Sequence, residues 1–211
     1  MFVCWSVKGG SGTTVVAAAL ALVLSRTHPS LLVDLCGDVP GALGLPEPAG
    51  PGVRDWLASP TSGADALDRL AVPVDPDLQV LPCGPRDTPT PTVRWAELGA
   101  GLRAHPHTVV VDAGVGRPPG ALLDGPVTSL LVIRSCYLAL RRAATTGVRP
   151  TGVVLIAEPG RALGVGEVER AAGAPVVAEL PYDPAVGRWV DGGMLAGRVP
   201  RSIEHPLRGA A

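Results

Sequence analysis

The chain has 211 residues and a formal net charge of −1, with 46% hydrophobic and 18% charged residues. This balance excludes a disordered chain, and the small net charge excludes a global field that recruits nucleic acid. The length suits one domain over residues 1–211. The first residues lack the basic region of a secretory signal, and the longest apolar stretch, Val15–Leu24, is too short to span a bilayer. We therefore expect a cytoplasmic protein without a membrane span.

Short apolar runs alternate along the chain with segments of helical pattern. Strands are expected over 3–7, 31–34, 78–81, 108–112, 129–134, 152–156 and 175–179. Helices are expected over 14–25, 52–58, 64–70, 93–104, 137–146 and 165–172, with a last one from Pro184 toward Val190. Segments 36–51 and 82–92 are rich in proline and glycine, which predicts loops at the carboxyl edge of the sheet.

The strand runs indicate the class of fold. Several of them are continuously apolar, which is typical of strands that are buried on both faces. Their alternation with helices favours a doubly wound architecture. The sequence therefore predicts an α/β fold with a mainly parallel sheet and helices on both faces.

A glycine-rich turn over residues 8–14 follows the first expected strand. A P-loop reads G-x-x-x-x-G-K-[ST]: its backbone N–H groups wrap phosphates, its lysine neutralises them and its hydroxyl holds Mg²⁺. If Gly12 is the last glycine of this pattern, Val7 replaces the first glycine, Thr13 replaces the lysine and Thr14 supplies the hydroxyl. Lys8 is the only lysine in the chain. Taken alone, the segment favours a plain tight turn between a strand and a helix over a phosphate-binding loop.

Residues 8–12 resemble the deviant Walker A motif, K-G-G-x-G-K-T, of the MinD/ParA superfamily. In that family the early lysine reaches across a dimer to the partner's nucleotide, and Lys8 matches it. The second lysine, which grips the protein's own nucleotide, is replaced by Thr13. The family has a core leucine seven residues after that lysine, and Leu20 lies seven residues after Thr13. This register indicates a substitution rather than a deletion, within a MinD/ParA-like P-loop domain.

Two further segments resemble motifs of the same family. Residues 32–36 are similar to its V-D-x-D switch, where Asp34 matches the first aspartate, on the metal side. Cys36 replaces the second aspartate, which orients the attacking water, and Asp38 is the candidate substitute. Residues 109–112 match the Walker B strand, with Asp112 as a metal-side carboxylate. The alternative role for Asp34 and Asp112 is helix capping at strand ends.

The end of the chain also carries the resemblance. Residues 180–183 and 189–193 are similar to the family's I-P-Y-D and following stretch near the adenine, whereas Ala157 and Glu158 stand where the family has an Asn-Arg pair. The matches cover nearly the whole chain. Residues 34–45 and the layout look most like the CpaE/TadZ proteins, without their usual N-terminal receiver-like domain.

The resemblance implies a set of site residues, with ATP or ADP and Mg²⁺ as cofactors. Losing the second lysine removes a charged contact of about 1.5–3 kcal/mol, so nucleotide binding is expected to be weak or absent. Lys8 and Asp38 have catalytic roles only if the site is active. The nucleotide-binding residues are Lys8, Gly9, Gly10, Ser11, Gly12, Thr13, Thr14, Pro181 and Asp183, and the metal-binding residues are Thr14, Asp34 and Asp112.

A basic group flanks and occupies the helix after the fifth expected strand, and it consists of Arg134, Arg141, Arg142 and Arg149. ParA-like proteins bind DNA nonspecifically through such residues, which makes Arg141 and Arg142 candidates, although a solvated helix face is the alternative. Residues 200–211 show no amphipathic run, so a MinD-type membrane helix is not expected.

These observations favour a MinD/ParA-like scaffold or positioning protein with a degenerate ATP site, acting as a homodimer with a protein partner. Two alternatives remain open. One is a slow ATPase in which Lys8 and Asp38 compensate for the substitutions. The other is a partitioning factor that binds DNA nonspecifically through Arg141 and Arg142.

Overall fold

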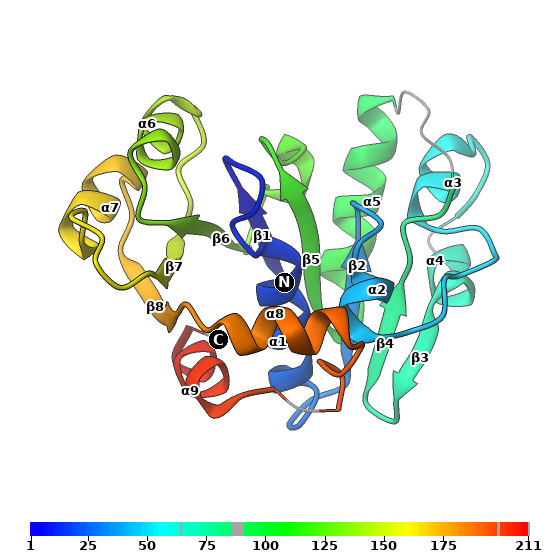
Figure 1. Ribbon diagram of the computed structural model, residues 1–211. Coiled ribbons are helices and arrows are strands. Elements are labelled where there is room, and N and C mark those ends of the chain that lie inside the picture. Colours follow the sequence, from blue (N-terminus) through cyan, green and yellow to red (C-terminus); the bar gives the residue numbers. More distant parts are fainter. Residues whose placement is uncertain (64, 86–90, 198, 211) are drawn as a thin grey trace.

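A computed structural model describes residues 1–63, 65–85, 91–197 and 199–210 of the chain. Its described strands form one sheet in the order β3-β4-β2-β5-β1-β6-β7-β8 (Figure 1). All neighbouring strands are parallel except β3, which pairs antiparallel with β4 at one edge. The strands are β1 Phe2–Ser6, β2 Ser30–Asp34, β3 Val72–Asp75, β4 Leu78–Leu81, β5 Thr108–Val115, β6 Thr128–Arg134, β7 Gly152–Ala157 and β8 Val176–Pro181.

Helices cover both faces of this sheet, which confirms the predicted doubly wound α/β architecture. The described helices are α1 Thr13–Leu24, α2 Val39–Leu43, α3 Val53–Ala58, α4 Asp65–Leu70, α5 Thr92–Ala104, α6 Tyr137–Thr145, α7 Val165–Ala172, α8 Pro184–Asp191 and α9 Arg201–Ala210, with a short 3₁₀ helix at Gly120–Leu122.

The alternation of side chains along the strands divides the core between the two faces. On β5, Val110 packs with α1, α2, α8 and α9, whereas Val109 and Val111 pack on the opposite face with α3, α4 and α5. Helices α6 and α7 extend that second layer over β6 and β7, where Leu131 and Leu155 are buried. Strands buried on both faces explain why the runs in the sequence are continuously apolar.

Most expected elements agree with the structure to within one or two residues, including the helix that begins at Pro184. The expected loop over 36–51 is wrong in part, because α2 forms there between Gly37 and Gly44, which both have positive φ. Strand β3 was not expected; it is an edge strand containing Pro73, and proline is tolerated at an edge. Residue 64 of the expected helix 64–70 and residues 86–90 of the expected loop 82–92 lie outside the described residues.

The absence of an amphipathic run near the C-terminus is a wrong prediction. Residues 201–210 form α9, whose Ile203 and Leu207 are buried against β8 and α1. The pattern is hard to see because only two large apolar residues, four positions apart, anchor a helix that also contains Pro206. The apolar face of α9 is thus covered by this chain itself. No helix in the described ranges is long and apolar enough to cross a bilayer.

Candidate nucleotide and metal site

The candidate residues lie where the central parallel strands end. β1 runs between β5 and β6, and the glycine loop follows it directly. Asp34 ends β2 and pairs in register with Asp112 on β5, so the sheet itself places the two carboxylates side by side. Open α/β sheets bind ligands at the carboxyl ends of their strands, and these residues share that edge.

The glycine loop has the backbone shape that an anion site requires. Gly10 and Gly12 have φ of 75° and 85°, a region that favours glycine. The Ser11 hydroxyl donates to Lys8 O at 2.7 Å and holds the turn closed. Helix α1 begins directly after Gly12, which brings no side-chain acceptor to its N-terminus. The first N–H groups of α1 are therefore left to an anion.

The two ends of the loop differ in charge. Thr13 is 6% exposed and puts no cation where the family has its second lysine. Lys8 is partly exposed, and in the described part of the chain its ammonium makes one hydrogen bond, to Gly9 O at 3.4 Å. Lys8 is therefore available to a partner outside this chain, whereas the interior of the loop has no lysine.

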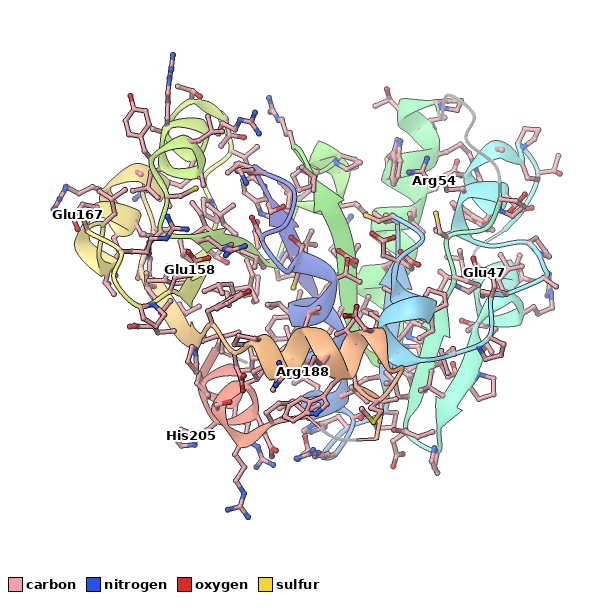
Figure 2. All side chains as sticks on the ribbon, in the orientation of Figure 1. Glu47, Arg54, Glu158, Glu167, Arg188 and His205 are labelled. Atoms are coloured by element: carbon pink, nitrogen blue, oxygen red, sulfur yellow. The ribbon has the colours of Figure 1, made fainter. Side chains whose placement is uncertain are left out.

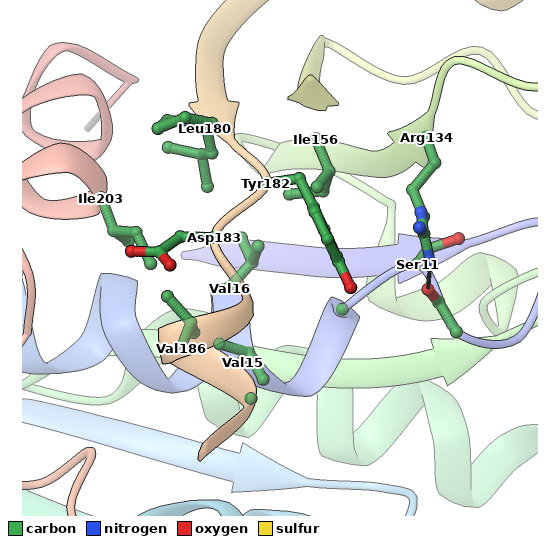
Figure 3. Close-up of a pocket in the computed structure, with 14 residues that line it drawn as sticks. Ser11, Val15, Val16, Arg134, Ile156, Leu180, Tyr182, Asp183, Val186 and Ile203 are labelled. Atoms are coloured by element: carbon green, nitrogen blue, oxygen red, sulfur yellow. Dashed lines mark hydrogen bonds between the residues drawn. The ribbon is translucent and has the colours of Figure 1, made fainter. Parts of the chain in front are cut away.

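A cavity of about 200 Å³ opens between the glycine loop and the turn from β8 to α8 (Figure 3). Mostly apolar walls surround it, and Tyr182, Asp183 and Arg134 supply polar groups. The Asp183 carboxylate also accepts from Ala185 N at 2.8 Å and caps α8. Its lining residues are Gly10, Ser11, Gly12, Val15, Val16, Arg134, Ile156, Leu180, Pro181, Tyr182, Asp183, Val186, Gly187 and Ile203.

The Asp34 carboxylate is fully buried and is held by the backbone that follows it. It accepts from Cys36 N at 2.9 Å, Gly37 N at 2.7 Å and Val39 N at 3.2 Å. Burial raises the pKa of Asp34, and these hydrogen bonds oppose the rise. Asp34 thus shapes the turn into α2, which agrees with the capping role as well as with a place beside a metal.

Asp112 is the more exceptional of the two carboxylates. It is fully buried; its Oδ1 accepts from Gly114 N at 3.0 Å, and among the described residues its Oδ2 has no hydrogen bond of normal geometry. Burial raises the pKa of Asp112 to about 6, although the nearby Thr14 side chain works in the opposite direction. A buried carboxylate oxygen without a partner, next to a threonine hydroxyl, fits the binding of a hard cation such as Mg²⁺.

Cys36 completes this group. Its Sγ lies 3.8 Å from Asp112 O and so close to Gly114 that a Cβ there would lie 2.1 Å from the sulfur. Donor atoms of Asp34, Cys36 and Asp112 all lie within 4.8 Å of one another. Cys36 is exposed as a residue, but partial burial of its thiol and the nearby carboxylates raise the pKa of that thiol to about 12. A neutral thiol is a poor acceptor for an attacking water and a poor ligand for Mg²⁺.

The structure brings some predicted residues together and leaves others apart. Gly10, Ser11, Gly12, Pro181 and Asp183 surround the cavity, whereas Lys8, Gly9, Thr13 and Thr14 are not part of its described lining. The exposed Asp38 lies close enough to contribute to the raised pKa values of Asp34 and Asp112. The DNA candidates Arg141 and Arg142 are both exposed on α6, and Arg142 Nη1 donates to Val7 O at 3.4 Å.

Sequence reasoning missed the apolar walls of the cavity and two of its polar residues, Tyr182 and Arg134. Tyr182 lies inside the quoted 180–183 segment but was not included among the nucleotide-binding residues. Arg134 was considered only as part of a basic group, although a charged residue at the carboxyl end of a parallel strand is a usable signal for a ligand contact.

Comparisons with solved structures agree with the fold of this chain. A ParA family ATPase from Chlorobium tepidum TLS is 20% identical, with a TM-score of 0.78 over 98% of this chain and 94% of that one. The septum site-determining protein MinD from Pyrococcus horikoshii OT3, complexed with Mg-ADP, is 19% identical, with a TM-score of 0.75 over 99% and 93% of the two chains. A MinC:MinD cell division protein complex from Aquifex aeolicus contains a chain that is 17% identical, with a TM-score of 0.76 over 98% and 93%.

Neither protein-family models nor curated protein sequences give a match to this chain. The likeness therefore rests on structure, and it extends over nearly the full length of each compared chain. The chain has the fold of the MinD and ParA ATPases.

Proposed function

We propose that this chain is a MinD/ParA-like scaffold or positioning protein that binds ATP or ADP weakly, hydrolyses ATP poorly, and acts through a homodimer and a protein partner. The proposal rests on one observation: the backbone shape of the glycine loop is kept, whereas two side chains expected for catalysis are replaced. The loop keeps its left-handed glycines at 10 and 12, while Thr13 and Cys36 occupy the positions of a lysine and an aspartate.

Weak nucleotide binding is supported by the cavity beside the loop. Its apolar walls and the exposed face of Tyr182 suit a flat nucleobase, and the N-terminus of α1 suits the phosphates. The compared MinD from Pyrococcus horikoshii was solved with Mg-ADP. The absent lysine lowers affinity by about one to two orders of magnitude relative to a site that has it.

Poor hydrolysis is supported by two independent substitutions. A lysine at position 13 would stabilise charge on the transferred phosphoryl group, and threonine does not. An aspartate at position 36 would accept a proton or orient a water, and a neutral thiol does neither well. Asp34 and Asp112 remain, so a metal with bound nucleotide is compatible with the same site.

Dimerisation is supported by the surface around the loop. Two exposed apolar residues lie after or at the ends of the strands that flank β1. Val115 at the end of β5 is 61% exposed, and Tyr137, the first residue of α6, is 73% exposed. With the available ammonium of Lys8, they form a face suited to a second copy of this chain. The compared MinC:MinD complex makes a further protein partner a reasonable expectation.

Calorimetric titration of the full chain with Mg-ADP and Mg-ATP tests the nucleotide part. We expect dissociation constants between about 10 μM and 1 mM and no turnover above background. Micromolar binding with turnover that Lys8→Ala abolishes would instead establish a slow ATPase.

Sedimentation of the full chain, with and without nucleotide, tests the dimer. Tyr137→Asp is expected to shift the chain to monomer because it places a charge in the apolar face. Val165→Asp is the matched control, since Val165 is an exposed apolar residue at the start of α7. Equal sedimentation of both variants and wild type would contradict the proposed face.

A further inference from the structure

Arg134 lines the same cavity, beside the glycine loop. It ends β6, and its guanidinium points toward the glycine loop (Figure 3). Nη1 of Arg134 donates to Gly10 O at 3.2 Å, and the guanidinium carbon lies 5.1 Å from the centre of the Tyr182 ring. The group is thus placed against the loop on one side and a ring of the cavity wall on the other.

Glu158 holds this arginine in place. It follows β7 and lies on the side of the molecule that carries α6 and α7 (Figure 2). Its side chain is 9% exposed and forms ion pairs with both Arg134 and Arg161. Two guanidinium groups and one carboxylate leave one net positive charge in this cluster, so the ion pair with Glu158 orients Arg134 without neutralising the site.

Three cationic side chains donate hydrogen bonds to backbone carbonyl groups in the glycine loop or next to it. Besides Arg134 at Gly10 O, Arg142 donates to Val7 O and Lys8 to Gly9 O. Of these three, only Arg134 also lines the cavity. A guanidinium has five N–H donors, and the contacts with Gly10 and Glu158 leave several of them for an anion.

We propose that Arg134 is the phosphate-binding cation of this site and stands in for the lysine that Thr13 replaces. The cation comes from the end of β6 rather than from the first turn of α1, and it reaches the phosphates of a nucleoside diphosphate or triphosphate from the side of Tyr182. This inference rests on the proposed nucleotide binding and names the residue on which that binding depends.

Titration with three probes tests the assignment: Mg-ADP, inorganic pyrophosphate and adenosine. Arg134→Gln is expected to weaken ADP and pyrophosphate about 10- to 100-fold and to leave adenosine within twofold, because the base site keeps its apolar walls. Arg134→Lys should recover part of the loss. Arg141→Gln is the matched control, since Arg141 is exposed on α6 and its side chain has no hydrogen bond or ion pair in the described ranges.

The outcomes separate this inference from the proposed function. If wild type binds none of the three probes, both fail. If wild type binds ADP and Arg134→Gln binds it equally well, the role of Arg134 is overturned and nucleotide binding stands. Tighter ADP binding by Arg134→Gln would also overturn it, because Arg134 would then be blocking the cavity. Circular dichroism of each variant confirms that a loss of binding does not reflect unfolding.

Discussion

Two neighbouring regions at the carboxyl edge of the sheet differ in how well their side chains match the proposed binding and hydrolysis of nucleotide. The binding half consists of loop residues 10–12, Arg134 and Tyr182, and it keeps a shaped cavity with a cation beside it. The acidic half consists of Asp34, Cys36 and Asp112, and it has two buried carboxylates and a thiol at the position where the resembled switch motif has its second aspartate. Under the proposed function, nucleotide binding and hydrolysis depend on separable residues, so a change in one half should leave the task of the other half in place.

The largest expected effect comes from introducing a lysine at position 13 and an aspartate at position 36 in the same chain. In Thr13→Lys/Cys36→Asp, the lysine supplies phosphoryl charge stabilisation and the aspartate orients water. We expect single-turnover ATP hydrolysis to rise about 100-fold or more over wild type. Phosphate release measures it, with Thr13→Lys/Cys36→Asp/Asp112→Asn as an inactive control. A folded, ATP-binding double variant that hydrolyses no faster than wild type would contradict the division between the halves.

Asp112→Asn measures how much the buried negative charge of Asp112 lowers the stability of the folded protein. The folded-state pKa of Asp112, about 6, lies above its ordinary value of 3.8, so the folded protein binds this proton more tightly than the unfolded chain does. Wild type therefore loses up to about 3 kcal/mol of stability as pH rises from 4 to above 6. Asp34, whose pKa is also raised, adds to the decline in both proteins.

Urea unfolding at a series of pH values measures this difference without added metal. Asp112→Asn should match wild type in stability near pH 4 and exceed it by up to about 3 kcal/mol at pH 7 and above. A difference between the two proteins that is constant across pH would show that Asp112 has an ordinary pKa in the folded state.

Thr13→Lys alone tests whether a second cation raises the affinity of the binding half for nucleotide. A lysine at this position faces the phosphates in addition to Arg134, so ADP affinity should rise about 10- to 100-fold by calorimetry. Thr13→Ser is the matched control and should bind as wild type does. In an Arg134→Gln background, Thr13→Lys should restore ADP affinity to at least the wild-type value. Absence of that rescue would mean that the two positions do not serve the same phosphates.

The smallest expected effect is that of Cys36→Ser on binding. The sulfur lies against Asp112 O and Gly114, away from the described lining of the cavity. ADP affinity should therefore remain within about twofold of wild type. A loss of tenfold or more would place Cys36 in the binding half and remove the distinction between the two regions.

Much of the fold was predictable because both faces of the sheet are buried. Continuous apolar runs such as 109–111 mark such strands, and the glycine loop marks the first β–α turn. The elements that were missed have weak local patterns: α2 is five residues long, β3 is an edge strand, and α9 is anchored by Ile203 and Leu207. Their positions depend on tertiary contacts that one sequence does not display.

The candidate site was predictable to a similar extent. Asp34 and Asp112 follow apolar runs, so their convergence could be expected before the structure was known. The role proposed for Arg134 could not be derived in this way, because it depends on the contacts of its guanidinium with Glu158 and Tyr182, which follow two other strands. Spacing within a motif reveals residues of one loop. The position of Arg134 at a strand end signals a ligand contact, but its partners on other strands appear only in the three-dimensional structure.

Single-turnover incubation of excess protein with radiolabelled Mg-ATP, followed by ultrafiltration, tests the central claim most directly. One sample reports both the fraction of nucleotide retained with the protein and the fraction that is still ATP. Binding without efficient hydrolysis predicts retained label that stays intact ATP over many minutes and is lost in Arg134→Gln. Rapid conversion of the retained ATP to ADP, or no retention by wild type, would contradict it.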